Sequence, residues 1–135
     1  MADMQENRQE KRYRVKEGVI AVIGNHANVL GQIIDISLSG LSFRYMDNGQ
    51  KEDNDRLTIL STDQNFYLVN IPFETVSDFS LHNIPSFSSM VMRRRCLRFG
   101  TLTTEQTAQI KRFIARYASS ESLKNASDSG NVAAI

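Results

Sequence analysis

The sequence predicts a mainly β protein: a small six-stranded antiparallel β-barrel with one C-terminal amphipathic α-helix. Short segments rich in β-branched and aromatic residues alternate with turn-forming segments along most of the chain, which is typical of small barrels. Helical periodicity with a capping signal occurs only near the C-terminus. The 135 residues are enough for one domain with a core, but not for two.

Six or so strands are predicted from a series of β-rich segments, which are bounded by polar turns and the last of which is long. They are Val19–Ile23, Leu30–Leu38, Leu41–Tyr45, Leu57–Leu60, Phe66–Ile71, Phe73–Phe79 and Met90–Gly100. Gly24–Asn28 predicts a turn, and Met46–Arg56 predicts a polar loop. Pro72 separates two of the segments and marks an edge or a bend. The last segment carries arginines on both faces, so we expect it to bend or to run along an edge.

A helix is predicted shortly after Gly100. Thr103 and Gln106 form a capping box, in which the two side chains bond to free amides at the start of a helix. The apolar stripe of this helix consists of Ile110, Phe113, Ile114 and Tyr117. We expect the helix to cover one end or one side of the barrel.

Composition divides the chain into a polar, charged N-terminal arm of residues 1–11, a folded domain of residues 12–118, and a low-complexity polar tail of residues 119–135. The arm and the tail are expected to be disordered on their own, because they have too little apolar surface to fold. No apolar segment is long enough to cross a membrane, there is no secretory signal, and Cys96 is the single cysteine. We therefore expect a cytoplasmic protein.

Two short motifs carry the functional information. The first is Arg8-Gln9-Glu10-Lys11-Arg12, with two arginines four residues apart; the second is Asp35-Ile36-Ser37-Leu38-Ser39-Gly40. An arginine side chain grips phosphate with two parallel hydrogen bonds, stacks on bases, and pairs with the O6/N7 edge of guanine. An anionic guanine nucleotide uses all three of these properties. A solvated charged arm is the alternative interpretation of the first motif taken alone.

The second motif is predicted to lie at the end of a strand. Apolar residues fall on even positions before it, at Leu30, Ile34, Ile36 and Leu38, although Ile33 interrupts the pattern. Asp35 and Ser37 should therefore share the opposite face. The apolar residues then move to odd positions, so we expect a bulge or turn at Gly40, where glycine allows unusual backbone angles and close approach of a ligand. The alternative is a hairpin in which Asp35 and Ser37 only satisfy turn amides.

The order and spacing of these motifs resemble the PilZ domain, the bacterial receptor module for cyclic di-GMP, whose signature is RxxxR followed by [D/N]xSxxG. The resemblance covers about residues 8–118 and implies the small barrel with a C-terminal helix. Its specific motifs lie in the first third, while Arg98-Phe99-Gly100 looks like the final strand of the family. It implies that the ligand is cyclic di-GMP and that no cofactor or metal is needed.

The resemblance also implies the role of each site residue. The two arginine forks are Arg8 and Arg12, Asp35 accepts from the guanine edge, Ser37 bonds a phosphate or base, and Gly40 clears space beside the strand. Possible accessory residues are Lys11, Arg14, Ser39 and Arg98. Asn7 stands where many family members carry an arginine associated with two stacked nucleotides, so the number of bound nucleotides stays open.

We expect the arm to be disordered when free and to fold over the bound nucleotide, which would change the surface offered to an unidentified protein partner. Two arginines alone cannot order the arm, because each backbone residue costs about 1–2 kcal/mol to order. Contacts with both motifs are needed.

Two other functions are compatible with a small barrel. One is a protein-interaction adaptor that keeps the fold without binding nucleotide; intact motifs argue against it. The other is a single-stranded nucleic-acid binder that uses Phe43, Tyr45 and the basic strand Arg93–Arg98, although alternating aromatic residues are more simply core residues. The role of the Arg93-Arg94-Arg95 cluster stays open; a solvated charged face is its ordinary explanation.

The sequence does not predict an enzyme. His26 and His82 lie in separate loop-like segments, no metal-ligand spacing occurs, and no nucleophile has a base nearby. We therefore assign no catalytic residue and no metal site.

Overall fold

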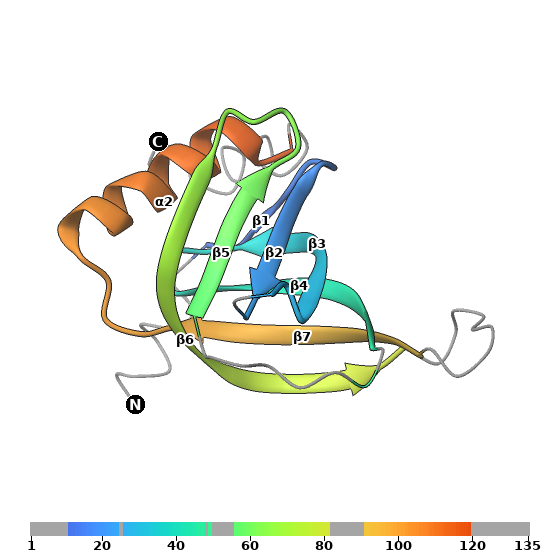
Figure 1. Ribbon diagram of the computed structural model, residues 1–135. Helices are drawn as coiled ribbons and strands as arrows, with labels where there is room; N and C mark the ends of the chain where they lie inside the picture. Colours follow the sequence, from blue (N-terminus) through green and yellow to red (C-terminus); the bar gives the residue numbers. More distant parts are fainter. Residues whose placement is uncertain (1–10, 25, 48, 50–55, 82–90, 120–135) are drawn as a thin grey trace.

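The computed structural model describes residues 11–24, 26–47, 49, 56–81 and 91–119. Arg8, the rest of the arm up to residue 10, His82 and the tail from residue 120 lie outside the described residues. The described residues form seven strands and one helix (Figure 1). These are β1 (Tyr13–Arg14), β2 (Val19–Ile23), β3 (Val29–Ile36), β4 (Gly40–Asp47), β5 (Arg56–Ser61), β6 (Tyr67–Ser80), β7 (Val91–Phe99) and α2 (Thr104–Tyr117).

Six of the described strands close into an antiparallel barrel, which confirms the predicted fold class. The sheet order is β1-β3-β2-β5-β6-β7-β4, and β4 pairs back with β3 to complete the ring. β1 lies outside the ring and pairs with β3, with Tyr13 opposite Ile36 and Arg14 opposite Asp35. Among the described residues, no helix combines the length and the apolar character needed to span a membrane.

The helix forms as predicted and covers part of the barrel. The hydroxyl of Thr103 accepts from the Gln106 amide, and the Gln106 side chain accepts from the Thr103 amide, both at 3.0 Å. Figure 1 shows α2 beside the upper ends of β5 and β6. The four residues of its predicted apolar stripe are all buried, and Phe113 packs its ring 4.9 Å from that of Phe66. The helix therefore completes the apolar core.

The main chains at the two ends of the described domain are hydrogen-bonded to each other. The Lys16 amide donates to the Tyr117 carbonyl at 2.8 Å, and the Ser119 amide donates to the Arg14 carbonyl at 2.8 Å. Val15 and Ala118 form an isolated antiparallel bridge between these bonds. We call residues 14–16 and 117–119 the clasp. It joins β1, which borders Asp35, to the end of α2.

The two segments that flank Pro72 are one continuous strand. β6 is 14 residues long, and its first half pairs with β5 while its second half pairs with β7. Pro72 lies where the partner changes, and its carbonyl accepts from the Gly100 amide at 2.7 Å. The long curve of β6 in Figure 1 agrees with the predicted bend. Proline has no N–H to donate. It is tolerated here because it lies at the end of the ladder with β5, next to the start of the ladder with β7.

The arginine-rich strand was predicted to bend or to run along an edge, and the second of these alternatives is wrong. β7 pairs with β4 on one side and with β6 on the other. In a closed barrel, alternate residues of each strand face the interior and the outside. Arg95 is accordingly buried, whereas Arg98 is exposed.

Candidate functional site

A bulge in β3 sets the position of Asp35. The pairing of β3 with β4 shifts register between Ile33 and Asp35. Before the shift the core residues are on odd positions, including Ile33, and after it the core residue is Ile36. The alternation in the sequence placed Leu30 and Leu38 on the apolar face of the strand. This prediction was wrong, because the two residues are 52% and 41% exposed. The bulge inserts one extra residue, so the residues that face the core change from odd to even positions. A prediction from simple alternation does not include such a change.

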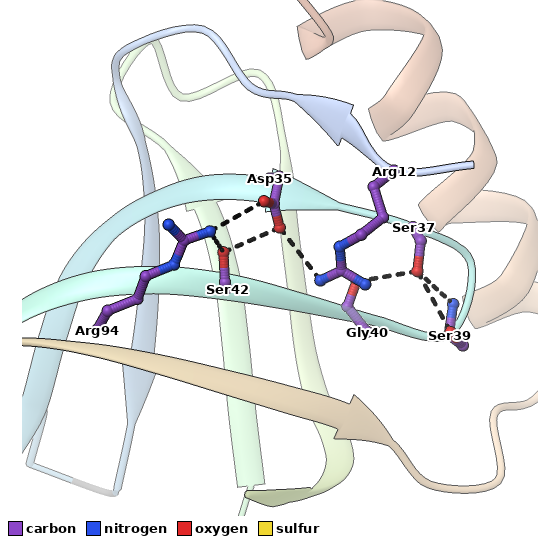
Figure 2. A network of polar contacts seen from close by, with 7 residues as sticks. All are labelled: Arg12, Asp35, Ser37, Ser39, Gly40, Ser42 and Arg94. Atoms are coloured by element: carbon purple, nitrogen blue, oxygen red, sulfur yellow. Dashed lines mark hydrogen bonds and ion pairs between the residues drawn. The ribbon is translucent and has the colours of Figure 1, made fainter. Parts of the chain in front are cut away.

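Asp35 is the centre of a polar network that joins three strands and the start of the domain (Figure 2). Its Oδ1 accepts from Ser42 Oγ at 2.9 Å and from Arg12 Nη2 at 3.1 Å. Its Oδ2 accepts from Arg94 Nη2 at 3.1 Å. The same Arg94 nitrogen donates to Ser42 Oγ at 3.0 Å. Asp35 thus contacts side chains and does not merely satisfy turn amides.

Ser37 has a different role in this structure. Its side chain is buried in the β3–β4 turn, where Ser37 Oγ accepts from the Ser39 amide at 3.1 Å. The Ser37 amide donates to the Gly40 carbonyl at 2.8 Å. Here the alternative interpretation applies in part, because the Ser37 hydroxyl stabilises the turn. Figure 2 shows Ser37 and Ser39 beside Arg12 at the end of the hairpin.

Gly40 is required for close packing of main chains. A Cβ atom at this position would lie 2.1 Å from the carbonyl oxygen of Leu97 on β7. Its backbone φ is not in the left-handed region, so the predicted need for unusual backbone angles was wrong. Instead, Gly40 lets β4 and β7 approach each other beside Asp35 and Ser37. The glycine of the motif therefore affects the pocket by allowing β7 to lie close to β4.

The residues of the second motif meet Arg12 at a pocket of about 400 Å³. The residues that line it are Arg12, Asp35, Ser37, Ser39, Gly40, Ser42, Val76, Ser77, Arg94, Cys96, Leu97 and Arg98. Arg98 Nε donates to Glu74 Oε2 at 2.8 Å, and both side chains are more than 60% exposed. Lys11 and Arg14 are exposed and do not line the pocket. Three cationic side chains and one carboxylate thus face this pocket within the described part of the chain.

Arg94 and Ser42 are the site residues that sequence reasoning missed. The arginine cluster separates in the structure, since neighbouring residues of a strand point to opposite faces. Arg93 Nε donates to Asp78 Oδ1 at 2.8 Å, and Arg95 donates to Thr75 Oγ1 at 2.8 and 3.0 Å. Arg94, between them, points toward Asp35. Its position in the middle of the cluster was the available signal.

The aromatic residues of β4 belong to the core. Phe43 is completely buried and Tyr45 is 7% exposed. Burial and a hydrogen bond to Asp78 raise the pKa of Tyr45 to about 12. A nucleic-acid groove needs exposed aromatic rings on which bases can stack, and these two rings are not available for that.

The structure is a small barrel with a pocket lined by three arginines among the described residues. The family model of the PilZ domain matches residues 6–116, and the chain therefore belongs to the PilZ domain family. The PilZ domain of YcgR from Escherichia coli with c-di-GMP has a similar structure. The two chains share 14% sequence identity with a TM-score of 0.58, over 92% of this chain and 97% of that one.

A crystal structure of YcgR in complex with c-di-GMP from Escherichia coli is similar at 13% identity and a TM-score of 0.56. The match covers 81% of this chain and 45% of that one, so the present chain spans less than half of that protein's length. At these identities the likeness concerns the fold. The comparison with curated proteins gave no match.

Proposed function

We propose that this protein is a receptor for cyclic di-GMP and that it binds the dinucleotide in the pocket between Arg12 and Asp35. One observation carries the proposal. Arg12 and Asp35 come from motifs 23 residues apart, yet they meet at 3.1 Å at a pocket of about 400 Å³. Its membership of the PilZ domain family supports the same ligand, as do the two similar structures with c-di-GMP.

The chemistry of the pocket suits this ligand. Cyclic di-GMP carries two phosphodiester charges and two guanines, so it needs cationic donors and an acceptor for the guanine N1–H and N2–H₂ groups. In our proposal Arg12 and Arg8 bind phosphate or stack on a base, and Asp35 accepts from the guanine edge. Ser37 and Gly40 complete the site, and Lys11, Arg14, Ser39 and Arg98 are accessory.

The pair of Arg12 with Asp35 is suited to exchange. The Arg12 side chain is 48% exposed, and an exposed ion pair contributes only about 0–1 kcal/mol to stability. A charge-assisted hydrogen bond to phosphate contributes about 1.5–3 kcal/mol. Binding can therefore move Arg12 from the carboxylate to a phosphate with a net gain, which also frees an acceptor position on Asp35 Oδ1.

We further propose that the arm of residues 1–11 folds over the bound dinucleotide, while residues 12–118 form the folded domain. The complex then signals to a protein partner in the cytoplasm, without catalysis by this chain. Arg12, the residue that follows the arm, contacts Asp35 through an ion pair in which the arginine side chain is 48% exposed. This supports a movable arm, because little stability is lost when such a pair opens.

Calorimetric titration with cyclic di-GMP tests the proposal, with GTP and a single-stranded oligonucleotide as controls. We expect saturable binding of cyclic di-GMP, at one or two molecules per chain, and much weaker binding of both controls. Absence of binding by a folded sample would favour the adaptor function. Preferential binding of the oligonucleotide would favour the nucleic-acid function.

A further inference from the structure

Arg94 holds Asp35 by a route that does not involve the first motif. Its Nη2 lies 3.1 Å from Asp35 Oδ2 and 3.0 Å from Ser42 Oγ, and Ser42 Oγ in turn donates to Asp35 Oδ1 at 2.9 Å. The three side chains form a closed triangle on adjoining strands, as Figure 2 shows. Both carboxylate oxygens therefore have a donor even when the contact of Arg12 is left aside.

The two arginines on Asp35 differ in how they are held. Arg12 precedes β1, outside the closed barrel, and its side chain is 48% exposed. Arg94 lies inside β7, which is paired on both sides, and its side chain is 33% exposed. Release of Arg12 to a ligand leaves the pair between Arg94 and Asp35 in place. Arg94 is the fixed partner, and Arg12 is the exchangeable one.

A carboxylate in an anion-binding pocket requires such a fixed partner. Asp35 is only 17% exposed, and without a cation it would repel a ligand that carries two negative charges. A hydrogen bond to a base edge also needs its acceptor held in one orientation, since a misplaced acceptor loses discrimination between bases. Arg94 and Ser42 satisfy both needs at once.

We propose that Arg94 is a positioning residue that orients Asp35 and so sets the selectivity of the pocket for guanine. The inference rests on the proposed function, in which Asp35 accepts from the guanine edge. It assigns a selectivity role to a residue of β7 that lies 59 positions from Asp35 and outside both sequence motifs.

The test compares cyclic di-GMP with cyclic di-IMP, which lacks the exocyclic N2 amino group of guanine but keeps the ring and both phosphates. The measured quantity is the ratio of the Kd for cyclic di-IMP to the Kd for cyclic di-GMP. We expect a ratio well above one for the unmodified chain. Arg94→Gln should weaken cyclic di-GMP binding by at least about tenfold and should lower this ratio, because the orientation of Asp35 is lost.

Two further variants separate positioning from charge. Ser42→Ala removes a hydroxyl that bonds to both partners without changing the charge, and it should lower the ratio as Arg94→Gln does. Arg44→Gln is the matched control, because Arg44 is paired with Arg94 in register, is exposed, and does not line the pocket. It removes the same charge nearby and should leave the ratio unchanged. Circular dichroism confirms that each variant is folded.

The outcomes are distinguishable. If Arg94→Gln and Ser42→Ala leave the ratio at its original value, whatever their effect on absolute affinity, Arg94 contributes only charge and the inference fails. Equal lowering of the ratio by Arg44→Gln overturns it as well. If the unmodified chain does not bind cyclic di-GMP, or binds both dinucleotides equally, the proposed base recognition by Asp35 fails, and the inference fails with it. If Arg94→Gln is unfolded, the result for Ser42→Ala decides.

Discussion

The Cα of Gly40 faces the carbonyl oxygen of Leu97 so closely that a Cβ atom on Gly40 would lie 2.1 Å from that oxygen. Gly40 pairs with Arg98 in the ladder between β4 and β7, and it begins β4 directly after the turn that contains Ser37. The β4–β7 ladder and the lining of the pocket therefore share this piece of main chain.

Gly40→Ala should accordingly destabilise the fold, because main chain cannot move aside as a flexible side chain can. We expect a loss of at least about 2 kcal/mol in the free energy of unfolding, measured by urea denaturation. Gly49→Ala is the control. Its φ of +84° is unfavourable for alanine, but no atom lies within 4 Å of its Cβ, so about 1 kcal/mol is expected. Equal losses at both positions would show that packing against Leu97 does not limit residue 40.

Arg12→Ala should weaken cyclic di-GMP binding at least tenfold, about 1.4 kcal/mol, while the melting temperature of the free protein stays nearly unchanged. The reason is that its ion pair with Asp35 is exposed and contributes little to folding. Calorimetric titration and thermal unfolding measure the two effects. Arg112→Ala, on the exposed side of α2, should change neither. A marked drop in the melting temperature for Arg12→Ala alone would mean that Arg12 is structural.

Asp35→Ala distinguishes base recognition from simple charge balance. Removal of the carboxylate leaves Arg12 and Arg94 without their shared partner and makes the pocket more positive. If charge alone governed affinity, the variant would bind the anionic dinucleotide more tightly, especially at low salt. We expect weaker binding at both low and high salt, measured by titration at two ionic strengths. Tighter binding at low salt would contradict the assignment.

Stability at acidic pH should depend on Ser61. The Ser61 hydroxyl, followed by the Asn65 main-chain amide, lowers the pKa of Asp63 from 3.8 to about 2. Because this pKa is lower in the folded chain, Asp63 stabilises the fold above about pH 4, and the contribution is lost as the pH falls toward 2. Ser61→Ala should raise the pKa of Asp63 and reduce the loss of stability in this window.

NMR titration of the Asp63 carboxyl carbon and urea unfolding at two pH values measure these effects. Tyr117→Phe is the comparison, because the hydroxyl of Tyr117 bonds to Asp63 but is a smaller cause of the shift. It should raise the pKa less than Ser61→Ala does. An unchanged pKa in the serine variant would refute this account.

Hydrogen exchange tests the proposed arm. Amides of residues 7–11 should exchange rapidly in the free protein and become protected with saturating cyclic di-GMP. The Val15 amide, which donates to the Ile34 carbonyl at 3.0 Å, and the Ala21 amide in β2 should be protected in both states. Protection of residues 7–11 without ligand would exclude a disorder-to-order transition, even if binding itself is demonstrated.

The barrel and helix could be predicted because their signals are local. A compact apolar segment marks β2, apolar alternation marks β4, and Thr103 with Gln106 marks the start of α2. Which residues of β3 face the core could not be predicted in the same way. The bulge near Ile34 depends on pairing with β4, and only the partner strand determines where an extra residue is inserted.

The site was predictable only where the residues stand in a recognisable motif. Arg12 and Asp35 were selected because they stand in the two motifs, and the structure brings them together in an ion pair. Their roles toward a ligand stay predictions. Arg94 and Ser42 could not be assigned, because their place beside Asp35 follows from the pairing of β4 with β7 and of β3 with β4. The local sequence shows only that Arg94 stands in the middle of an arginine cluster, and it does not reveal the register that brings Arg94 to Asp35.

The clasp has a consequence for the order of folding. Its bonds, including that from Lys16 to Tyr117, join segments separated by about one hundred residues of chain. Contacts that close so long a loop have a large entropic cost, and they form readily only after the intervening chain is compact. We therefore expect the clasp to be the last part of the domain to form and the first to open. Partial unfolding would then begin at β1, whose Arg14 pairs with Asp35, while the barrel itself stays closed.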